Sequence, residues 1–290
     1  MPYLKARAEV FRFNIDLWEQ YSWSIGSAGY ELIDPTGRVC RECEVGAVYE
    51  RKVMFNPPSI DVPAAGSPES WLRNEVLLIW SSIKDLAFHD GKLALIHPSP
   101  YGVWYKMRQM RLAARYFPVP EWQMLHAAPV QLQGAVVCKT NGVQPMGGGK
   151  ILTVNRVEPT AIDVTYPWFL QRMLADATHD VTVAYIAGKL YASELARNGT
   201  ADGRVSAANG KAQWQPCELT PEQSDAICRM MRETGLSFSR LDFLRDPSGT
   251  LHFLEFNPNG QFAWLDLHDE RGLLTAVAQE ILRVHATHCR

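Results

Sequence analysis

Two carboxylates and an amide mark the segment LDFLRDPSGTLHFLEFN, residues 241–257. Glu255 and Asn257 are two positions apart in a strand-like run, and side chains with that spacing share one face of a strand. A turn predicted at 246–249 is expected to bring Asp242 onto the same face. Hard oxygen ligands without Cys or His suit Mg²⁺. The alternative is a pair of strand-edge ion contacts, but carboxylates among apolar neighbours are costly without partners, which favours a metal.

A magnesium site of this kind is incomplete without phosphate groups, so the chain should also supply cations for them. Lys139 ends the apolar run AVVCK and directly precedes a loop that contains Gly147, Gly148 and Gly149. Backbone N–H groups of such a loop can close over phosphate oxygens. Lys106 begins a predicted helix and faces away from the core positions. Each lysine alone is typical of a solvated surface charge, and only the combination favours phosphate binding.

The elements that must position these residues are read from periodicity and from turn and capping signals. The pattern of 236–257 predicts a hairpin, and Thr220-Pro221 with Gly235 predicts a helix between them. Ser70 is the predicted N-cap of a helix over 71–88. The other predicted elements include strands at 8–16, 45–55, 91–100, 135–139, 167–175 and 181–195, and helices at 103–116 and 270–286.

Composition narrows the class of protein. The chain has 290 residues, 47% of them hydrophobic and 21% charged, which is ordinary for a soluble domain. Lys and Arg number 29 against 31 Asp and Glu, so no basic surplus favours a nucleic-acid partner. No signal peptide or membrane-length apolar run is visible, so we expect a cytoplasmic protein without a membrane partner. Cys40 and Cys43 form a lone C-x-x-C, for which ordinary thiols are favoured over zinc or redox use.

The motifs together resemble a known family. Lys106 in YKMRQMRLA, Lys139 before its glycine loop, Gln171 in WFLQRML, and LDFLRDPSGTLHFLEFNPNGQFAWLD are similar to the ATP-grasp ligases. Within that superfamily, FLEFNPNGQFAWLD most resembles the ligases that make graspetides such as microviridins. Glutathione synthases and the ligases that add glutamate to ribosomal proteins share only the looser D…E-x-N pattern. The resemblance runs from about residue 8 to the C-terminus, and it is most specific in the hairpin.

The resemblance implies an α/β (α+β) fold of the ATP-grasp type. Residues 1–100 would form a reduced N-terminal α/β domain, because the family usually has a complete β-α unit before the strand matched at 8–16. Residues 101–195 would form a small central subdomain with the glycine-rich flap. Residues 196–290 would form the C-terminal subdomain, which clasps ATP and holds the magnesium site.

The resemblance also implies roles for individual residues. Lys106 and Lys139 would hold the ATP phosphates, and Arg204 would steady the transferred phosphate or the carboxylate. Arg204, Lys139 and Asn257 would therefore take part in catalysis. The metal ligands would be Asp242, Glu255 and Asn257. The remaining nucleotide contacts would come from the flap (Gly147, Gly148, Gly149) and from the hinge whose backbone reads adenine (Gln171, Arg172, Met173, Leu174).

The implied reaction uses ATP and Mg²⁺ to phosphorylate a carboxylate, which an amine or hydroxyl then attacks. The expected partner is a precursor peptide modified at Asp or Glu, and the Pro258 break would turn residues 259–261 toward it. A small amino acid or a short free peptide is an alternative acceptor. A nucleotide-binding protein that recognises peptides without ligating them is another alternative. Such ligases are often dimers, so a homodimer is also an expectation.

Two departures from the family pattern bear on the chemistry. The family commonly has an acidic-apolar-Arg sequence on its central strand, whereas HDVTV at 179–183 has Thr182 in place of that arginine. A cation that could contact the acyl phosphate is therefore absent or supplied elsewhere. In addition, TNGVQPMGGGKIL at 140–152 is not the usual Ser/Gly-rich phosphate loop, which leaves the flap contacts open.

Overall fold

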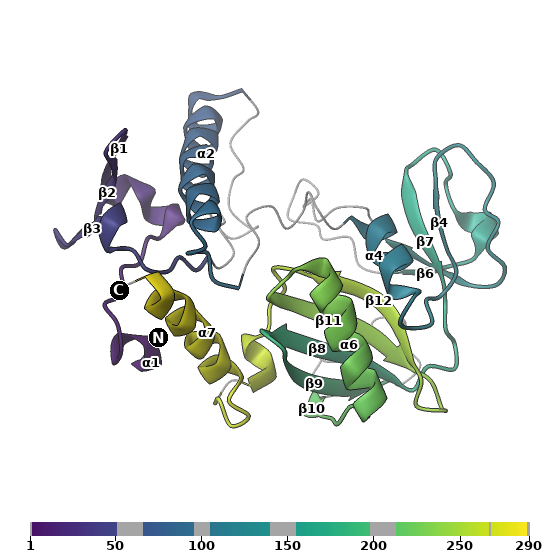
Figure 1. Cartoon of the computed structure of the whole chain (residues 1–290). Coiled ribbons are helices and arrows are strands. Elements are labelled where there is room, and N and C mark those ends of the chain that lie inside the picture. Colours follow the sequence, from purple (N-terminus) through teal and green to yellow (C-terminus); the bar gives the residue numbers. More distant parts are fainter. Residues whose placement is uncertain are drawn as a thin grey trace. The chain divides into compact units, whose positions relative to one another are not determined.

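The computed structural model describes residues 2–50, 66–95, 105–139, 155–197, 213–266 and 268–288. The chain divides into two compact units (Figure 1). Unit 1 comprises Met1–Pro100, Leu236–Phe238 and Asp266–Arg290, and unit 2 comprises Tyr101–Gly235 and Ser239–Leu265. The division predicted at residues 100 and 195 stays a prediction. In the described parts of the chain, no helix has the length and apolarity that a membrane span needs.

The described residues of unit 1 form a small antiparallel sheet and three α-helices. The sheet runs β1 (Ser22–Gly26), β2 (Gly29–Ile33) and β3 (Val39–Arg41) in that order. The helices are α1 (Pro2–Lys5), α2 (Pro68–His89) and α7 (Leu273–His288), of which α1 and α7 are in contact. Tyr30 and Leu32 of β2 pack against Ile83 of α2, so the core of this unit lies between the sheet and that helix.

Helix α2 confirms the helix predicted over 71–88, but it begins earlier. Its N-cap is Ser67, whose hydroxyl accepts a hydrogen bond from the Ser70 N–H, so the prediction of Ser70 as the cap was wrong. Pro68 then takes the first helical position, where its missing N–H costs nothing. Lys84 of the buried face forms an ion pair with Glu50 at 3.0 Å, and both side chains are buried.

The strand predicted over 8–16 was also wrong, because no strand forms there. Its alternating aromatic residues are nevertheless partly buried. Phe13 stacks on Trp80 of α2 with ring centroids 5.6 Å apart, and Phe11 packs against the unit's core cluster. The segment is anchored by the Tyr21 hydroxyl, which donates to the Arg12 carbonyl. An alternating pattern reports burial on one side, and it does not establish that a neighbouring strand is there to pair with.

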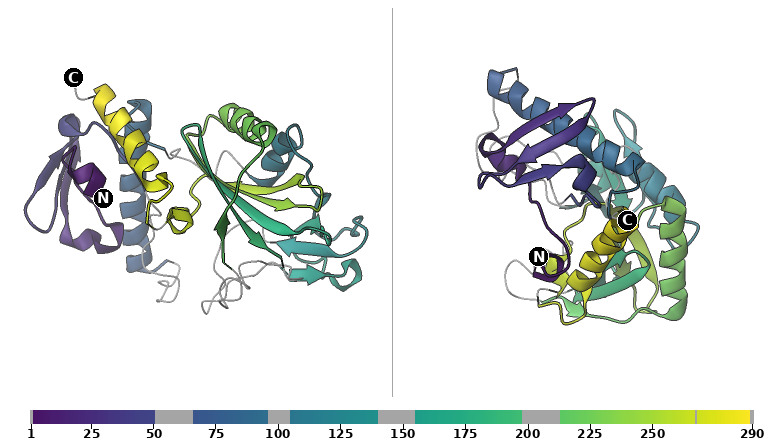
Figure 2. Two further views of the ribbon diagram at one scale, coloured as in Figure 1. Left: turned by 90° about the horizontal axis from the view of Figure 1, so that it is seen from below. Right: turned by 60° about the vertical axis from the view of Figure 1, so that its left-hand side comes forward.

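Unit 2 contains a five-stranded sheet with the order β10-β9-β8-β11-β12 (Figure 1). Helix α6 (Pro221–Thr234) lies along one face of it, as Figure 2 shows. The sequence signals for α6 are confirmed, since Thr220 and Gln223 form a capping box and Gly235 ends the helix with a φ of 71°. The strands are β8 (His179–Ile186), β9 (Lys189–Ala196), β10 (Gln215–Pro216), β11 (Phe238–Arg245) and β12 (Leu251–Asn257).

A second sheet of unit 2 has four antiparallel strands in the order β4-β7-β5-β6. These are β4 (Trp122–Leu125), β5 (Val136–Lys139), β6 (Asn155–Val157) and β7 (Trp168–Arg172). Helix α4 (Lys106–Ala113) precedes them and contacts β12 of the five-stranded sheet. Short 3-10 helices occur at Ile15–Gln20, Glu42–Glu44, Pro159–Ala161 and Ala263–Asp266.

Candidate nucleotide and metal site

The predicted hairpin of β11 and β12 contains a register shift next to its polar residues. Asp242 pairs with Glu255, whereas the next residue, Phe243, pairs with Phe253, so Leu254 is the extra residue of a bulge. Residues that pair directly across an antiparallel ladder have their Cβ atoms ~5 Å apart on one face. The bulge therefore allows Phe253 to stay in the core while Glu255 joins Asp242 on the opposite face.

Glu255 lies at the centre of this face. Its Oε2 atom accepts a hydrogen bond from Lys106 Nζ at 3.1 Å, and its Oε1 atom accepts one from Asn257 Nδ2 at 3.2 Å. Burial raises the pKa of the Glu255 carboxyl, but the charges of Lys106 and Lys139 and the two hydrogen bonds outweigh it and hold the pKa at about 2. Glu255 is therefore a carboxylate at neutral pH, as a metal ligand must be.

Asp242 is held by a different pair of side chains. Thr182 of β8 donates its hydroxyl to Oδ1 at 2.8 Å, and Arg240 of β11 donates to Oδ2 at 2.8 Å. The Thr182 hydroxyl also lies 3.3 Å from the Leu241 carbonyl. At the position where the family resemblance predicts an arginine, the chain thus has a buried hydroxyl that orients the predicted metal ligand.

Helix α4 is fixed against the outer edge of β12 by a side chain that sequence reasoning missed. The buried Gln109 accepts, through Oε1, a hydrogen bond from the Phe256 N–H at 3.0 Å. Phe256 lies between Glu255 and Asn257, so this bond sets the helix beside the two predicted ligands. Lys106, one turn before Gln109, then reaches Glu255, and its Nζ also lies 5.4 Å from the centre of the Phe169 ring.

Lys139 approaches the site from the four-stranded sheet. Its Nζ donates to Oε1 of Gln171 at 3.0 Å, across the pair of strands β5 and β7. Gln171 is only 2% exposed, and its amide nitrogen lies 3.9 Å from the sulfur of Met110 in α4. The predicted site residue Gln171 therefore positions Lys139 with its side chain, and it ties β7 to α4.

The other predicted hinge residues use their backbones within the fold. The N–H groups of Arg172 and Met173 donate to the carbonyls of Glu121 and Ala135, at 2.7 and 2.9 Å. Among the residues that the structure describes, the N–H of Leu174 has no such acceptor. Of the N–H groups at 172–174, the one at Leu174 is therefore the best placed to donate to an adenine ring.

Several predicted site residues fall outside the described part of the chain. They are Gly147, Gly148 and Gly149 of the flap, and Arg204. The flap residues belong to the connection between β5 and β6, which are paired neighbours in the sheet. Their predicted phosphate contacts, and that of Arg204, stay predictions.

The donor set suits Mg²⁺. No group of three or more His, Cys, Asp and Glu side chains able to hold a metal occurs in the described ranges. The hairpin face offers two carboxylates, and the Asn257 amide nitrogen is used by Glu255, which leaves the amide oxygen for a cation. Two carboxylates and an amide oxygen match a metal that completes its shell with water and substrate phosphates.

Comparison with known proteins identifies the fold. No protein-family model matches the sequence, and no curated protein matches it. The macrocyclase MdnC of Microcystis aeruginosa, solved with its precursor peptide MdnA, superposes with a TM-score of 0.78 at 17% identity, over 97% of this chain and 94% of that one. A RiPP-associated ATP-grasp ligase of Chryseobacterium gregarium, solved with ADP and a leader and core peptide, gives 0.76 at 18% identity, over 97% and 91%. The chain has the ATP-grasp fold.

A third ATP-grasp structure supports the same conclusion. The ligase PsnB, solved with a minimal precursor, Mg and ADP, superposes with a TM-score of 0.66 at 18% identity, over 99% of this chain and 92% of that one. The predicted α+β ATP-grasp architecture is therefore confirmed. Sequence identities this low establish architecture, so the roles of individual residues rest on the geometry of this chain.

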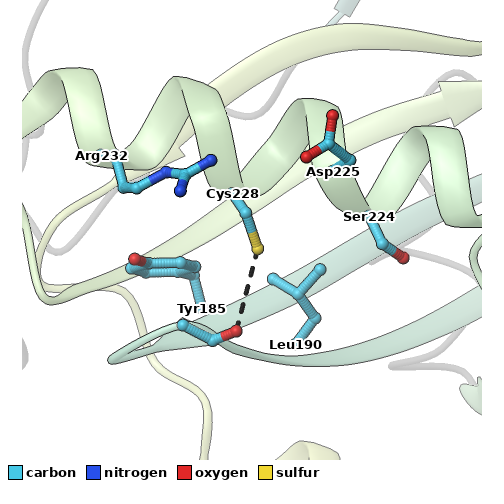
Figure 3. A pocket seen from close by; sticks show the side chains of 7 residues that line it. Tyr185, Leu190, Ser224, Asp225, Cys228 and Arg232 are labelled. Atoms are coloured by element: carbon cyan, nitrogen blue, oxygen red, sulfur yellow. Dashed lines mark hydrogen bonds between the residues drawn. The ribbon is translucent and has the colours of Figure 1, made fainter.

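A hollow of about 460 Å³ lies elsewhere in unit 2, and it is separate from the face of β11 and β12 that has the predicted metal ligands. It lies between α6 and the turn joining β8 and β9, where Tyr185, Cys228 and Arg232 are among the residues that line it (Figure 3). The Cys228 thiol lies 3.8 Å from the Gly188 carbonyl, and burial raises the pKa of that thiol. None of the predicted site residues lines this hollow.

Proposed function

We propose that the protein is an ATP-dependent ligase that joins a carboxylate to an amine or an alcohol, and that it modifies Asp or Glu side chains of a ribosomal precursor peptide. The observation that carries the proposal is the face of β11 and β12, where Lys106 contacts Glu255 beside Asp242 and Asn257. The ATP-grasp fold supports the use of ATP. The similarity to ligases solved with precursor peptides supports a peptide acceptor.

The chain's own residues define the chemistry in this proposal. Lys106 and Lys139 neutralise and position the ATP phosphates, and the Leu174 N–H orients the adenine. Asp242, Glu255 and Asn257 would hold Mg²⁺, which, when bound, neutralises charge on the phosphate oxygens. A carboxylate oxygen of the acceptor attacks the γ-phosphorus, the bond to the β-phosphate oxygen breaks, and ADP leaves with the electron pair. An amine or hydroxyl then displaces phosphate from the acyl carbon and loses its proton.

Electrostatic positioning accounts for most of the rate in this scheme, as it does in other phosphoryl transfers. The flap residues 147–149 and Arg204 are proposed to close over the phosphates and to steady the transferred group. In this scheme Lys139, Asn257 and Arg204 act directly on the reacting groups. Gln171 acts through Lys139, which it holds by the 3.0 Å hydrogen bond.

Two measurements test the proposal. Isothermal titration with Mg·ATP should give saturable binding, and a panel of Asp- and Glu-rich peptides should contain an acceptor that stimulates ADP release. Asp242→Ala or Glu255→Ala should abolish ADP release while the circular dichroism spectrum is retained. Absence of any binding at millimolar Mg·ATP would refute the proposal.

A non-ligating role is the second candidate, and the environment of Asp242 favours it. Both carboxylate oxygens of Asp242 already accept hydrogen bonds, from Thr182 and from Arg240. A protein that binds nucleotide and recognises a peptide without chemistry would bind Mg·ATP but release no ADP with any peptide. The panel should also contain single amino acids and short free peptides, because ADP release with one of those would assign a small acceptor instead.

A further inference from the structure

The charges on the face of β11 and β12 follow a definite order. Lys106 contacts Glu255, which pairs with Asp242 across the ladder, and Asp242 contacts Arg240 on its other side. Arg240 pairs across the ladder with Asn257, so it is the fourth member of the predicted metal-binding face. The lysines therefore lie at the Glu255 end of the face, and Arg240 lies at the opposite end, beyond Asp242.

Arg240 joins this face to the segment that follows β12. Its Nη1 donates to the Gln261 carbonyl at 3.3 Å, while its Nη2 donates to Asp242. A Cβ atom at Gly260 would lie 2.7 Å from the Cβ of Arg240, so only a glycine allows the chain to approach this closely. Residues 259–261, which the sequence analysis expects to face the acceptor, thus lie directly against Arg240.

Two buried polar atoms at this end have no hydrogen-bond partner among the described residues. They are Nε of Arg240 and Oδ1 of Asn259. Unpaired polar atoms in buried positions are costly and mark places where a further group is expected. The side chain of Arg240 is 20% exposed, so part of it can be reached from solvent although its Nε atom is buried.

Position 182 cannot supply the positive charge that the family pattern predicts there. Thr182 is neutral and 2% exposed, and its hydroxyl is used by Asp242. Arg240 and Thr182 approach the same carboxylate from two strands that are neighbours in the sheet. A guanidinium on β11 therefore lies beside the place that an arginine on β8 would occupy.

We propose that Arg240 is a further catalytic cation, beside Lys139 and Arg204, which contacts the transferred phosphoryl group and the acceptor carboxylate in place of the arginine absent at position 182. This inference rests on the proposed ligase function. As the carboxylate oxygen attacks the γ-phosphorus and ADP departs, the phosphoryl oxygens and the carboxyl oxygens carry the charge. Arg240 offers them N–H groups in a planar fork, which suits both groups, while Asp242 keeps the guanidinium oriented.

Nucleotides with and without a γ-phosphate test this role without an identified acceptor. Isothermal titration would compare Mg·AMPPNP with Mg·ADP at saturating Mg²⁺ for wild type, Arg240→Ala and Arg240→Lys. Arg240→Ala should weaken Mg·AMPPNP about tenfold and leave Mg·ADP within twofold, and Arg240→Lys should fall between. The double variant Arg240→Ala/Thr182→Arg should recover most of the lost Mg·AMPPNP affinity.

The matched control is Arg245→Ala on the same strand. Arg245 is 18% exposed and forms an ion pair with Glu194, away from the predicted metal ligands, so both nucleotides should bind as in wild type. An equal loss for both nucleotides in Arg240→Ala, or a loss that disappears as Mg²⁺ is raised, would show that Arg240 acts only through Asp242 and would overturn the inference. If the double variant does not recover affinity for Mg·AMPPNP, the inference that Arg240 takes the place of an arginine at position 182 would be overturned. A wild type that binds neither nucleotide would instead count against the proposed function itself.

Discussion

Two hairpins of the same five-stranded sheet differ in their strand register and in how they divide buried apolar residues from polar ones. The hairpin of β8 and β9 keeps one register through all eight pairs, from His179 with Ala196 to Ile186 with Lys189. The hairpin of β11 and β12 changes register between Asp242 and Phe243. The regular hairpin lies inside the sheet, and six successive residues of β8, from Val181 to Ile186, are buried. The irregular hairpin lies at the edge of the sheet, where β12 is the outermost strand, and it presents the face with Asp242 and Glu255.

The difference shows what the bulge contributes. In a strand with a strict period of two, Phe253 and Glu255 would share a face, so a buried phenylalanine would force the carboxylate toward the core. One extra residue, Leu254, allows Phe253 to be buried while Glu255 lies on the opposite face. The regular hairpin contributes Thr182 as a support for Asp242, whereas the bulged hairpin presents Asp242, Glu255 and Asn257 together.

The largest expected effect is a difference in Mg·ATP affinity between substitutions of two glutamates, one from each hairpin. Glu255 on β12 accepts from Lys106, and Glu194 on β9 accepts from Arg245, with side-chain exposures of 31% and 25%. Glu255→Gln removes a charged metal ligand and should weaken Mg·ATP binding by about a hundredfold, ~2.7 kcal/mol. Glu194→Gln should change it less than twofold. Isothermal titration measures both, and comparable losses in the two variants would contradict the assignment of the metal site to β12.

The same glutamate should affect stability as a function of pH. The pKa of Glu255 is lowered from 4.5 to about 2 in the folded protein, so its stabilising effect is complete above about pH 4.5 and is lost as the pH falls toward 2. Urea unfolding of wild type and Glu255→Gln should therefore show a difference at pH 6 that shrinks by pH 3. A difference that stays constant over this range would mean that the lysines do not hold the carboxylate in its charged form.

A smaller effect is expected at the support from the regular hairpin. Thr182→Val keeps the shape of the side chain but removes the donor to Asp242, so unfolding should become easier by about 1 kcal/mol. Mg·ATP affinity should fall a few fold, because Asp242 loses one of its two orienting partners. Thr182→Ser retains the hydroxyl and serves as the matched control. If Thr182→Ser loses as much stability and affinity as Thr182→Val, the effect is not specific to the hydroxyl, which would contradict its role as the support for Asp242.

The sequence was informative where the signals are local. The spacing of Glu255 and Asn257 and the turn after Arg245 predicted the common face, and Thr220 with Gly235 predicted α6. The spacing of the apolar positions Leu251, Phe253 and Phe256 also indicates the bulge. The first two are two residues apart, as in a regular strand, whereas the last two are three residues apart.

The parts that could not be predicted depend on contacts between distant segments. Gln109 binds a backbone group 147 positions away, and nothing in the helix around it indicates that partner. Arg240 could have been noticed two positions before Asp242, but its link to Gln261 required the path of the chain after β12. The predicted strand at 8–16 failed for the same reason, since its pattern could not report whether a pairing strand was near.

The smallest effect is expected at the hollow beside the regular hairpin. Cys228 is the thiol there, and because burial raises its pKa it stays protonated at neutral pH and is a weak nucleophile (Figure 3). Cys228→Ala should therefore leave Mg·ATP affinity within twofold and change the free energy of unfolding by ~0.5 kcal/mol. Titration calorimetry and urea unfolding check the two parts separately. A tenfold loss of nucleotide affinity would show that the hairpin of β8 and β9 transmits changes from α6 to Thr182 and Asp242. It would then be wrong to treat the hairpin of β8 and β9 as purely structural and the hairpin of β11 and β12 as the one that affects nucleotide binding.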